Sequence, residues 1–205
     1  MEMLFAWIRP SSKWRNHKRM KTQTFKSSIG FRKWLEKNHA DSEGLWLQFY
    51  KKSSGKETIT RAEALDQALC FGWIDGQAKP VDDQSWIQKF IPRRPKSGWS
   101  KLNTQHIERL TTAGAMTPAG MKAVEAAKAD GRWQAAYDSP RNAMPPEDFL
   151  KALDKDKKAK AFFETLNRAN VYAIVYRLQT AKKPETRERR MKMILEMLAV
   201  GKTFH

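Results

Sequence analysis

The sequence predicts an α+β protein in which an N-terminal α/β unit with a small antiparallel sheet is followed by an all-helical C-terminal unit. Three observations support this prediction. Strand-like patterns occur only within residues 45–93, with helical patterns before and between them. From Pro95 onward the apolar residues follow a helical period alone. The segment 139–146, SPRNAMPP, is rich in proline and polar residues and is the expected linker between the two units.

We therefore expect three regions along the chain. Residues 1–21 are predicted to be a disordered basic arm, because they carry six lysine or arginine side chains against Glu2 and show no sustained period. Residues 22–138 are predicted to form the α+β domain and residues 146–205 the helical domain. Both Met1 and Met20 are consistent with a natural start of the chain.

The first two elements are predicted from apolar spacing. Phe31, Trp34 and Leu35 lie at helical spacing behind Ser28, which predicts a helix that Ser28 caps and that runs to about residue 39. The segment 45–51, LWLQFYK, has large apolar side chains on both faces. This pattern is typical of a strand covered on both sides.

A helix and a hairpin are predicted next. Thr60 and Glu63 match a capping box, in which each side chain bonds the backbone amide of the other residue, and they predict a helix over residues 61–71. Residues 73–79 and 86–93 are short strand candidates, joined by the turn-rich sequence PVDDQ. We expect them to form an antiparallel hairpin.

The rest of the chain reads as helix. Ser100 is placed to cap a helix that stops at Gly114, and Thr117 with Pro118 opens another that ends at Gly131. Further helices are predicted over residues 146–154, 157–168, 171–182 and 185–200.

Composition excludes several classes of protein. At 205 residues, with 40% hydrophobic and 11% aromatic residues, the chain is too apolar to be intrinsically disordered. Cys70 is the only cysteine, so no intrachain disulfide can form. The apolar stretch 3–8 is too short for a secretion signal or a membrane span. We expect a cytoplasmic protein that does not insert into membranes, while its oligomeric state stays open.

Charge is the feature that bears most on function. Lysine and arginine number 39 against 22 acidic residues, which gives a net charge of +17 and favours anionic partners such as phosphates or nucleic acid. Without residues 1–21 the chain still carries +12. Six cations lie within residues 86–109, where Glu108 is the only acid.

The loop 92–103, PRRPKSGWSKLN, is the densest cluster of cationic and polar side chains. It leads into a predicted helix, whose N-terminal amides attract anions, and arginine suits phosphate or carboxylate oxygens. The sequence thus predicts an anion site here; alternatively, Ser100 only caps its helix and the cations are solvated. The full set of candidate ligand-binding residues is Trp73, Asp75, Arg93, Arg94, Ser97, Trp99, Ser100 and Asn103.

Individual residues within and near this set have alternative interpretations. Asp75 is either a group that orients an arginine or a ligand, or half of an Asp-Gly turn. Cys70 is expected to be a buried small hydrophobe. Trp86, Phe90 and Trp99 alternate with cations, which suits base stacking on nucleic acid; the alternative, which we favour, is that the rings pack inward from a half-buried strand.

No signature of catalysis is present in the sequence. The four histidines are scattered, so no metal site is expected, and the chain has no phosphate-binding loop, dinucleotide fingerprint or nucleophile elbow. We expect no cofactor and favour a binding protein over an enzyme. The rival hypotheses are an enzyme that uses Asp75, Arg93 and Ser100 on a small anionic substrate, and a non-specific nucleic-acid binder.

Five segments of the chain resemble the YdeI/OmpD-associated family of bacterial proteins, also labelled bacteriocin-protection proteins. The resemblance runs from about residue 24 to the end and implies a cytoplasmic protein with a helical C-terminal module. It also implies a stress-response role in resistance to bacteriocins or cationic antimicrobial peptides, with no known reaction. A net charge of +17 argues against direct capture of cationic peptides. The segments are WLEKNH (34–39), GLWLQFYKKSSG (44–55), EALDQALCFGWIDG (63–76), FIPRRPKSGWSKLN (90–103) and ETRERRMKMILEML (185–198).

Overall fold

The computed structural model describes residues 20–204, which form two compact units. Of these residues, one unit contains 20–64 together with Asp75–Pro92, and the other contains Leu65–Ile74 and 93–204. The predicted α+β class is confirmed, since the described residues form a four-stranded sheet and eight α-helices. Helices α1 and α2 lie between strands along the chain. The predicted arm lies outside the described residues except for its last two positions.

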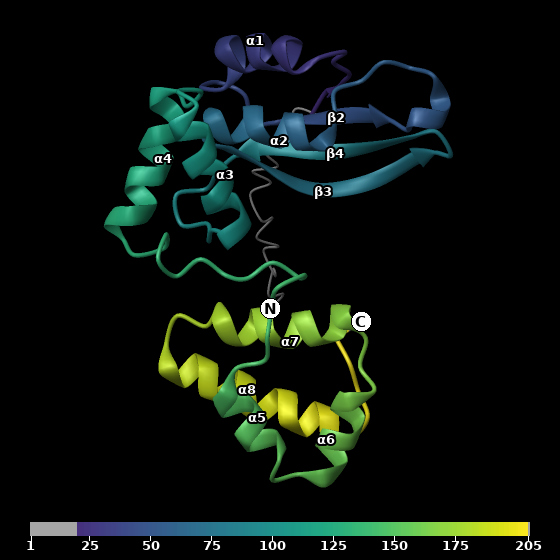
Figure 1. The fold of residues 1–205 in the computed structure, drawn as a ribbon, viewed down its shortest axis with the longest axis vertical. Coiled ribbons are helices and arrows are strands. Elements are labelled where there is room, and N and C mark those ends of the chain that lie inside the picture. Colours follow the sequence, from purple (N-terminus) through teal and green to yellow (C-terminus); the bar gives the residue numbers. More distant parts are fainter. Residues whose placement is uncertain (1–19, 205) are drawn as a thin grey trace, which may run out of the picture. The chain divides into compact units, whose positions relative to one another are not determined.

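The first unit is built around a sheet with the strand order β1-β2-β4-β3 (Figure 1). Strand β1 (Thr22–Gln23) pairs in parallel with β2 (Leu45–Tyr50), whereas β4 (Ser85–Pro92) pairs with β2 in the antiparallel sense. The prediction of an antiparallel sheet is therefore wrong in one respect: the sheet is mixed, because β1 and β2 are parallel. Two residues are too few to show a strand period, which is why β1 leaves no signal in the sequence.

The core of this unit lies against one face of β2. Leu45, Leu47 and Phe49 are buried, and the alternate side chains of the strand are half-buried, so β2 is covered on both sides as predicted. Helix α1 (Ser28–Asn38) buries Phe31, whose ring centroid lies 5.7 Å from that of Phe90 on β4.

Helix α1 begins at Ser28, the residue predicted to be its cap. Ser27, and not Ser28, is the N-cap, because its hydroxyl accepts a hydrogen bond of 3.3 Å from the amide of Gly30. Adjacent serines offer the same chemistry, so the sequence pattern does not separate them.

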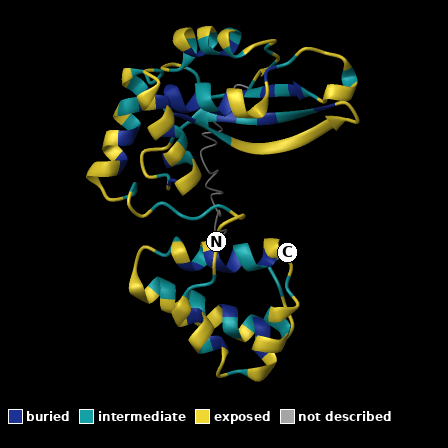
Figure 2. Ribbon diagram, viewed as in Figure 1, coloured by how far each residue is buried: buried dark blue, intermediate teal, exposed yellow. Residues whose placement is uncertain are grey.

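The predicted hairpin is present, with a longer first strand. Strand β3 (Trp73–Asp82) continues through Pro80, and it is exposed from Gly76 onward (Figure 2). Proline lacks an amide hydrogen, but β3 lies at the edge of the sheet, where one missing donor costs little. Asp82 closes the turn, because its carboxylate accepts from the amide of Gln84 at 2.8 Å and from the hydroxyl of Ser85 at 2.9 Å.

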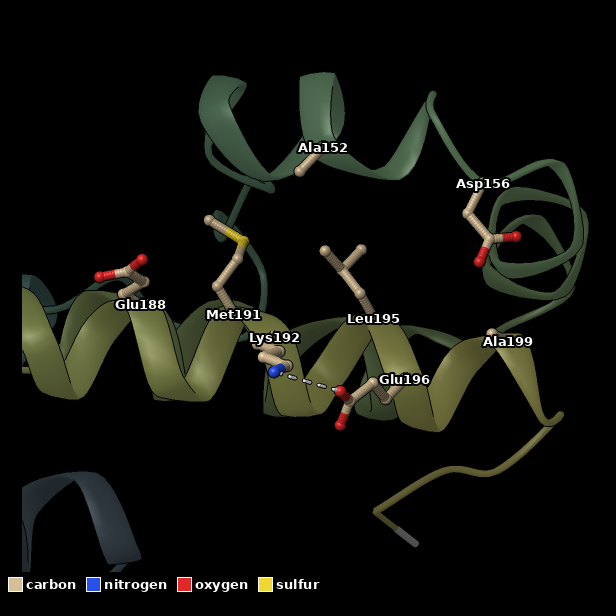
Figure 3. Close-up of a pocket in the computed structure, with 8 residues that line it drawn as sticks. All are labelled: Ala152, Asp156, Glu188, Met191, Lys192, Leu195, Glu196 and Ala199. Atoms are coloured by element: carbon tan, nitrogen blue, oxygen red, sulfur yellow. Dashed lines mark ion pairs between the residues drawn. The ribbon is translucent and has the colours of Figure 1, made fainter.

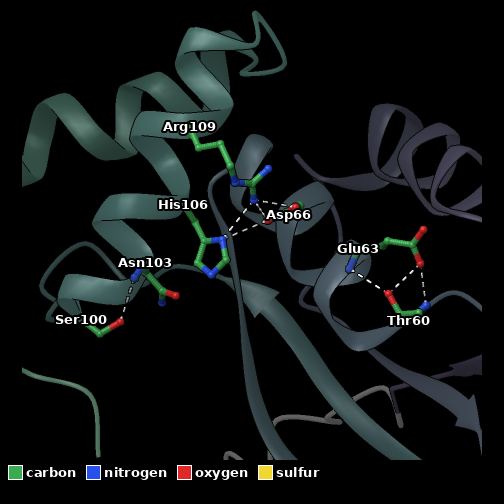
Figure 4. Close-up of polar contacts among 7 residues, drawn as sticks. All are labelled: Thr60, Glu63, Asp66, Ser100, Asn103, His106 and Arg109. Carbon is green, nitrogen blue, oxygen red and sulfur yellow. Dashed lines mark hydrogen bonds and ion pairs between the residues drawn. The ribbon is translucent and has the colours of Figure 1, made fainter. Parts of the chain in front are cut away.

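Helix α2 (Arg61–Cys70) begins with the predicted capping box. The amide of Glu63 donates to the hydroxyl of Thr60 at 3.2 Å, and the amide of Thr60 donates to the Glu63 carboxylate at 2.9 Å (Figure 4). The Thr60 hydroxyl also donates to this carboxylate, which is the main reason why the pKa of Glu63 is lowered.

Close packing joins α2 to the start of α4 in the second unit. Helices α3 (Lys101–Thr112) and α4 (Pro118–Ala129) are capped by Ser100 and Thr117, as predicted. The Thr117 hydroxyl also donates to the carbonyl of Cys70 at 2.7 Å. A Cβ at Gly120 would lie only 2.2 Å from that carbonyl oxygen, so only glycine allows this approach. Cys70 itself is buried, as expected.

The last four helices share an apolar core. The largest differences from the prediction are in α6, which ends at Glu164 instead of residue 168, and in α7, which begins at Arg168 and ends at Gln179 instead of spanning 171–182. Helix α7 begins there because the Asn167 side chain accepts from the amide of Asn170 at 3.0 Å. Among the described residues, every helix is too short or too polar to cross a membrane. The four helices are α5 (Glu147–Leu153), α6 (Lys157–Glu164), α7 (Arg168–Gln179) and α8 (Pro184–Ala199). The core consists of Phe149, Leu153, Ala159, Ile174, Leu178, Ile194 and Leu198.

Candidate anion-binding site

The basic loop begins where β4 ends, at Pro92, and it is ordered by its own hydrogen bonds. Both the amide and the hydroxyl of Ser97 donate to the carbonyl of Arg94, at 3.0 and 2.9 Å. The side chain of Arg94 is exposed. Ser97 therefore closes a turn that presents Arg94 to solvent.

Arg93 lies against the loop. Its guanidinium carbon is 3.6 Å from the ring centroid of Trp99, which is 2% exposed, and its Nη2 donates to the carbonyl of Gly98 at 2.7 Å. Its amide donates to the carbonyl of Gly72 at 2.9 Å. These contacts give Arg93 a structural role in fixing the loop.

Three of the first four amides of α3, those of Lys101, Asn103 and Thr104, have partners. Ser100 accepts from the amide of Asn103 through its hydroxyl at 3.2 Å and from the amide of Thr104 through its carbonyl at 3.0 Å. The amide of Lys101 donates to the carbonyl of Tyr137 at 2.9 Å. Ser100 thus acts as an N-cap, and an anion near this helix would depend on cationic side chains more than on backbone amides.

The segment that follows α4 runs beside the loop. Ser100 and Tyr137 form a parallel β-bridge, and the amide of Tyr137 donates to the carbonyl of Trp99 at 3.0 Å. This pairing brings Arg132 to the loop, where its Nη1 donates to the carbonyl of Ser97 at 3.0 Å.

Two aspartates balance part of the positive charge. Arg132 pairs with Asp130 at 2.7 Å, and Lys101 pairs with Asp138 at 2.8 Å. Hydrogen bonds from these cations are the main reason why the pKa values of both aspartates are lowered. Asp138 also accepts from the amide side chain of Gln179 at 2.7 Å.

A cavity of about 350 Å³ lies beside this charge network. Arg132 and Lys182 line it with positive charge and Asp130 with negative charge, and Tyr137 forms part of its wall. Gly98 and Gly131 also line it without contributing side-chain bulk. Its volume falls at the lower end of the range for small-molecule sites.

The structure brings together only part of the predicted set. Arg93, Arg94, Ser97, Trp99, Ser100 and Asn103 lie in one continuous loop and helix start. Trp73 is 1% exposed and belongs to the core of the protein.

Asp75 lies in the other unit and already has partners. It accepts from Arg61 at 2.5 Å and from the Nε2 of Gln88 at 2.9 Å. The prediction that it orients an arginine is confirmed, whereas the turn interpretation is wrong because Asp75 and Gly76 lie within β3.

Sequence reasoning missed Arg132, Tyr137 and Lys182. Arg132 and Ser97 are 35 positions apart in the sequence, and no local motif predicts their contact. Gly131 signalled only the end of α4.

A second polar cluster links α2 and α3 (Figure 4). Arg109 donates to both carboxylate oxygens of Asp66 at 2.7 Å and to the Nδ1 of His106 at 3.1 Å. His106 also lies 3.3 Å from Asp66. Within residues 20–204, no group of three or more histidine, cysteine, aspartate or glutamate side chains is placed to hold a metal ion.

The rings considered for base stacking are engaged in packing. Phe90 and Trp99 are 0% and 2% exposed, and Trp86 stacks on Phe49 at 5.3 Å between centroids. The inward-packing interpretation of these aromatic residues is therefore confirmed.

Comparison with known families gave two matches along the chain. Residues 142–201, which include α5–α8, match the family described as "Bacteriocin-protection, YdeI or OmpD-Associated". The predicted resemblance to this family is thus confirmed for that part of the chain. Residues 23–123, which include the basic loop, match a separate model, a domain of unknown function (DUF8412). Comparison with curated proteins and with solved structures gave no significant match.

Proposed function

Since residues 142–201 form a domain of the YdeI or OmpD-associated, bacteriocin-protection family, we propose that this protein serves such protection by binding a small anionic ligand. The ligand carries a phosphate or carboxylate group. Its binding site is the cavity lined by Arg132 and Lys182, next to the basic loop of residues 93–101.

The main support for the proposal is the arrangement of hydrogen bonds around the guanidinium of Arg132. Its side chain is only 12% exposed, and its Nε and Nη1 donate to Asp130 and to the carbonyl of Ser97. Those bonds hold the guanidinium in place. For Nη2, the described part of the chain supplies no hydrogen-bond acceptor, so its two hydrogens are available to an oxyanion.

The surroundings favour an anion of modest size. Lys182 adds a second, exposed cation at the cavity, and Arg94 and Lys96 add positive charge on the neighbouring loop. A net charge of +17 further raises the local concentration of anions. The volume of about 350 Å³ suits a ligand the size of a phosphorylated sugar or a nucleoside monophosphate.

A thermal-shift screen of inorganic phosphate, pyrophosphate, citrate and nucleoside monophosphates, followed by calorimetry, tests the proposal. A ligand at 100 times its dissociation constant should add about 2.7 kcal/mol of stability. Lys182→Gln should weaken binding about tenfold, because it removes a cation from the cavity. Lys122→Gln is the matched control, since Lys122 is an exposed lysine on α4 outside the cavity. Equal losses in both variants, or no stabilisation by any probe, would overturn the proposal.

A further inference from the structure

A groove of about 400 Å³ crosses the surface of the C-terminal helices, far along the sequence from the basic loop (Figure 3). Its floor is apolar: Met191, Leu195 and Ala199 form one row along α8, and Ala152 of α5 faces them. Leu195 and Met191 are only partly buried, although they pack on the core of these helices. The groove is thus an apolar surface left open between packed helices.

Acidic side chains dominate the rim of this groove. Glu188, Lys192 and Glu196 form a second row along α8, and Asp156 lies at the start of α6. Lys192 and Glu196 form an ion pair of 4.0 Å, so the single cation of the rim is already balanced. The rim therefore has three carboxylates and one ammonium group and is negatively charged, whereas the net charge of the whole chain is +17.

We propose that this groove binds an amphipathic helix of a partner peptide, with an apolar stripe flanked by lysine or arginine. The lining residues of α8 extend over twelve positions, from Glu188 to Ala199, and at 1.5 Å per residue this is about three helical turns. A helix of that length places apolar side chains at positions i, i+4 and i+7 on the floor. Its flanking cations meet Glu188 and Asp156 at the rim.

Charge complementarity selects this occupant over a second copy of the chain. Two copies joined through this face would bring their Glu188 and Glu196 rows together, and like charges in contact oppose association. The net charge of the protein repels a cationic partner at long range, but ions at physiological strength screen charges beyond about 8 Å. Contacts within the groove therefore determine the affinity. These contacts would allow the protein to bind cationic peptides at the groove, although its net positive charge alone argues against such binding.

The test uses the full chain and two synthetic helical peptides with the same apolar stripe, one flanked by lysine and the other by glutamate. Fluorescence anisotropy should show about tenfold tighter binding of the lysine peptide. Glu188→Gln with Glu196→Gln should reduce that preference severalfold. Glu164→Gln with Glu185→Gln is the matched control, because it removes two exposed carboxylates, one on α6 and one on α8, that lie outside the groove.

A substitution on the floor tests the location of the peptide. Ala152→Gln keeps a good helix former while extending a side chain into the groove, and it should abolish binding with the circular dichroism spectrum unchanged. Equal affinity for the two peptides, or binding that survives Ala152→Gln, overturns the proposal. A dimer in light scattering that Ala152→Gln dissociates assigns the groove to a second copy and also overturns it. The outcome is independent of the anion site, since Lys182→Gln should leave peptide binding unchanged.

Discussion

The guanidinium of Arg93 lies over the ring of Trp99, with its central carbon 3.6 Å from the ring centroid. The same guanidinium donates to the carbonyl of Gly98, one residue before the ring. A side chain that the sequence suggests as an anion contact therefore also fixes the loop in which the candidate site lies.

Replacing Arg93 should first affect stability. Arg93→Ala removes a hydrogen bond and a cation–π contact, so we expect the free energy of unfolding to fall by about 1–3 kcal/mol. Arg93→Lys should retain part of this, because a lysine can still reach the ring but cannot stack on it. Urea denaturation of the three proteins measures the effect. Unchanged stability in Arg93→Ala would show that Arg93 does not hold the loop.

The capping box of α2 should give an acid-dependent contribution to stability. The folded-state pKa of Glu63 is lowered from 4.5, so its stabilisation is present at neutral pH and is lost as the pH falls through the folded pKa. Thr60→Ala should cost about 1 kcal/mol at pH 7, and less in acid at a pH below the folded pKa, where the carboxylate is protonated. Thr60→Ser keeps the hydroxyl and is the control. Unfolding curves at both pH values check this, and a cost independent of pH would contradict the role assigned to the carboxylate.

Gly120 should be among the least replaceable residues of α4. Gly120→Ala would place a methyl group 2.2 Å from the carbonyl oxygen of Cys70, so the helices must move apart, and we expect a loss of about 3 kcal/mol or more. Gly114→Ala is the comparison: it has φ of +64° but open space around it, and should cost about 1 kcal/mol. Thermal unfolding distinguishes the two. Similar costs would mean that α4 adjusts its position freely.

Binding to nucleic acid should be weak and electrostatic. Because Phe90 and Trp99 are buried, no stacking on these rings is available, and only exposed cations such as Arg94 and Lys96 can contact phosphates. Fluorescence anisotropy with single-stranded and duplex DNA should show affinity that falls steeply between about 50 and 200 mM salt. Tight binding that persists at the higher salt would favour a specific nucleic-acid function instead of the anion cavity.

Local signals in the sequence were sufficient for most helices and for the hairpin. Ser100, Thr117 and the pair Thr60 and Glu63 act as caps where their spacing predicted it, because capping depends on residues within one turn. The parallel pairing of β1 with β2 and the approach of Arg132 to Ser97 depend on contacts between distant segments. No period or short motif reports such contacts. The cavity could not be predicted for the same reason, although the basic loop beside it could.

The two units of the chain are interleaved along the sequence. The backbone leaves the first unit after Ala64, returns at Asp75 and leaves again after Pro92. A fragment that begins at Arg93 would therefore lack residues 65–74, including the Asp66 carboxylate that Arg109 binds and the Cys70 carbonyl that Thr117 binds. No single cut yields both units intact. Isolating the second unit would require removal of the chain up to Ala64 together with deletion of Asp75–Pro92, with a short linker from Ile74 to Arg93. Point substitutions avoid both cuts.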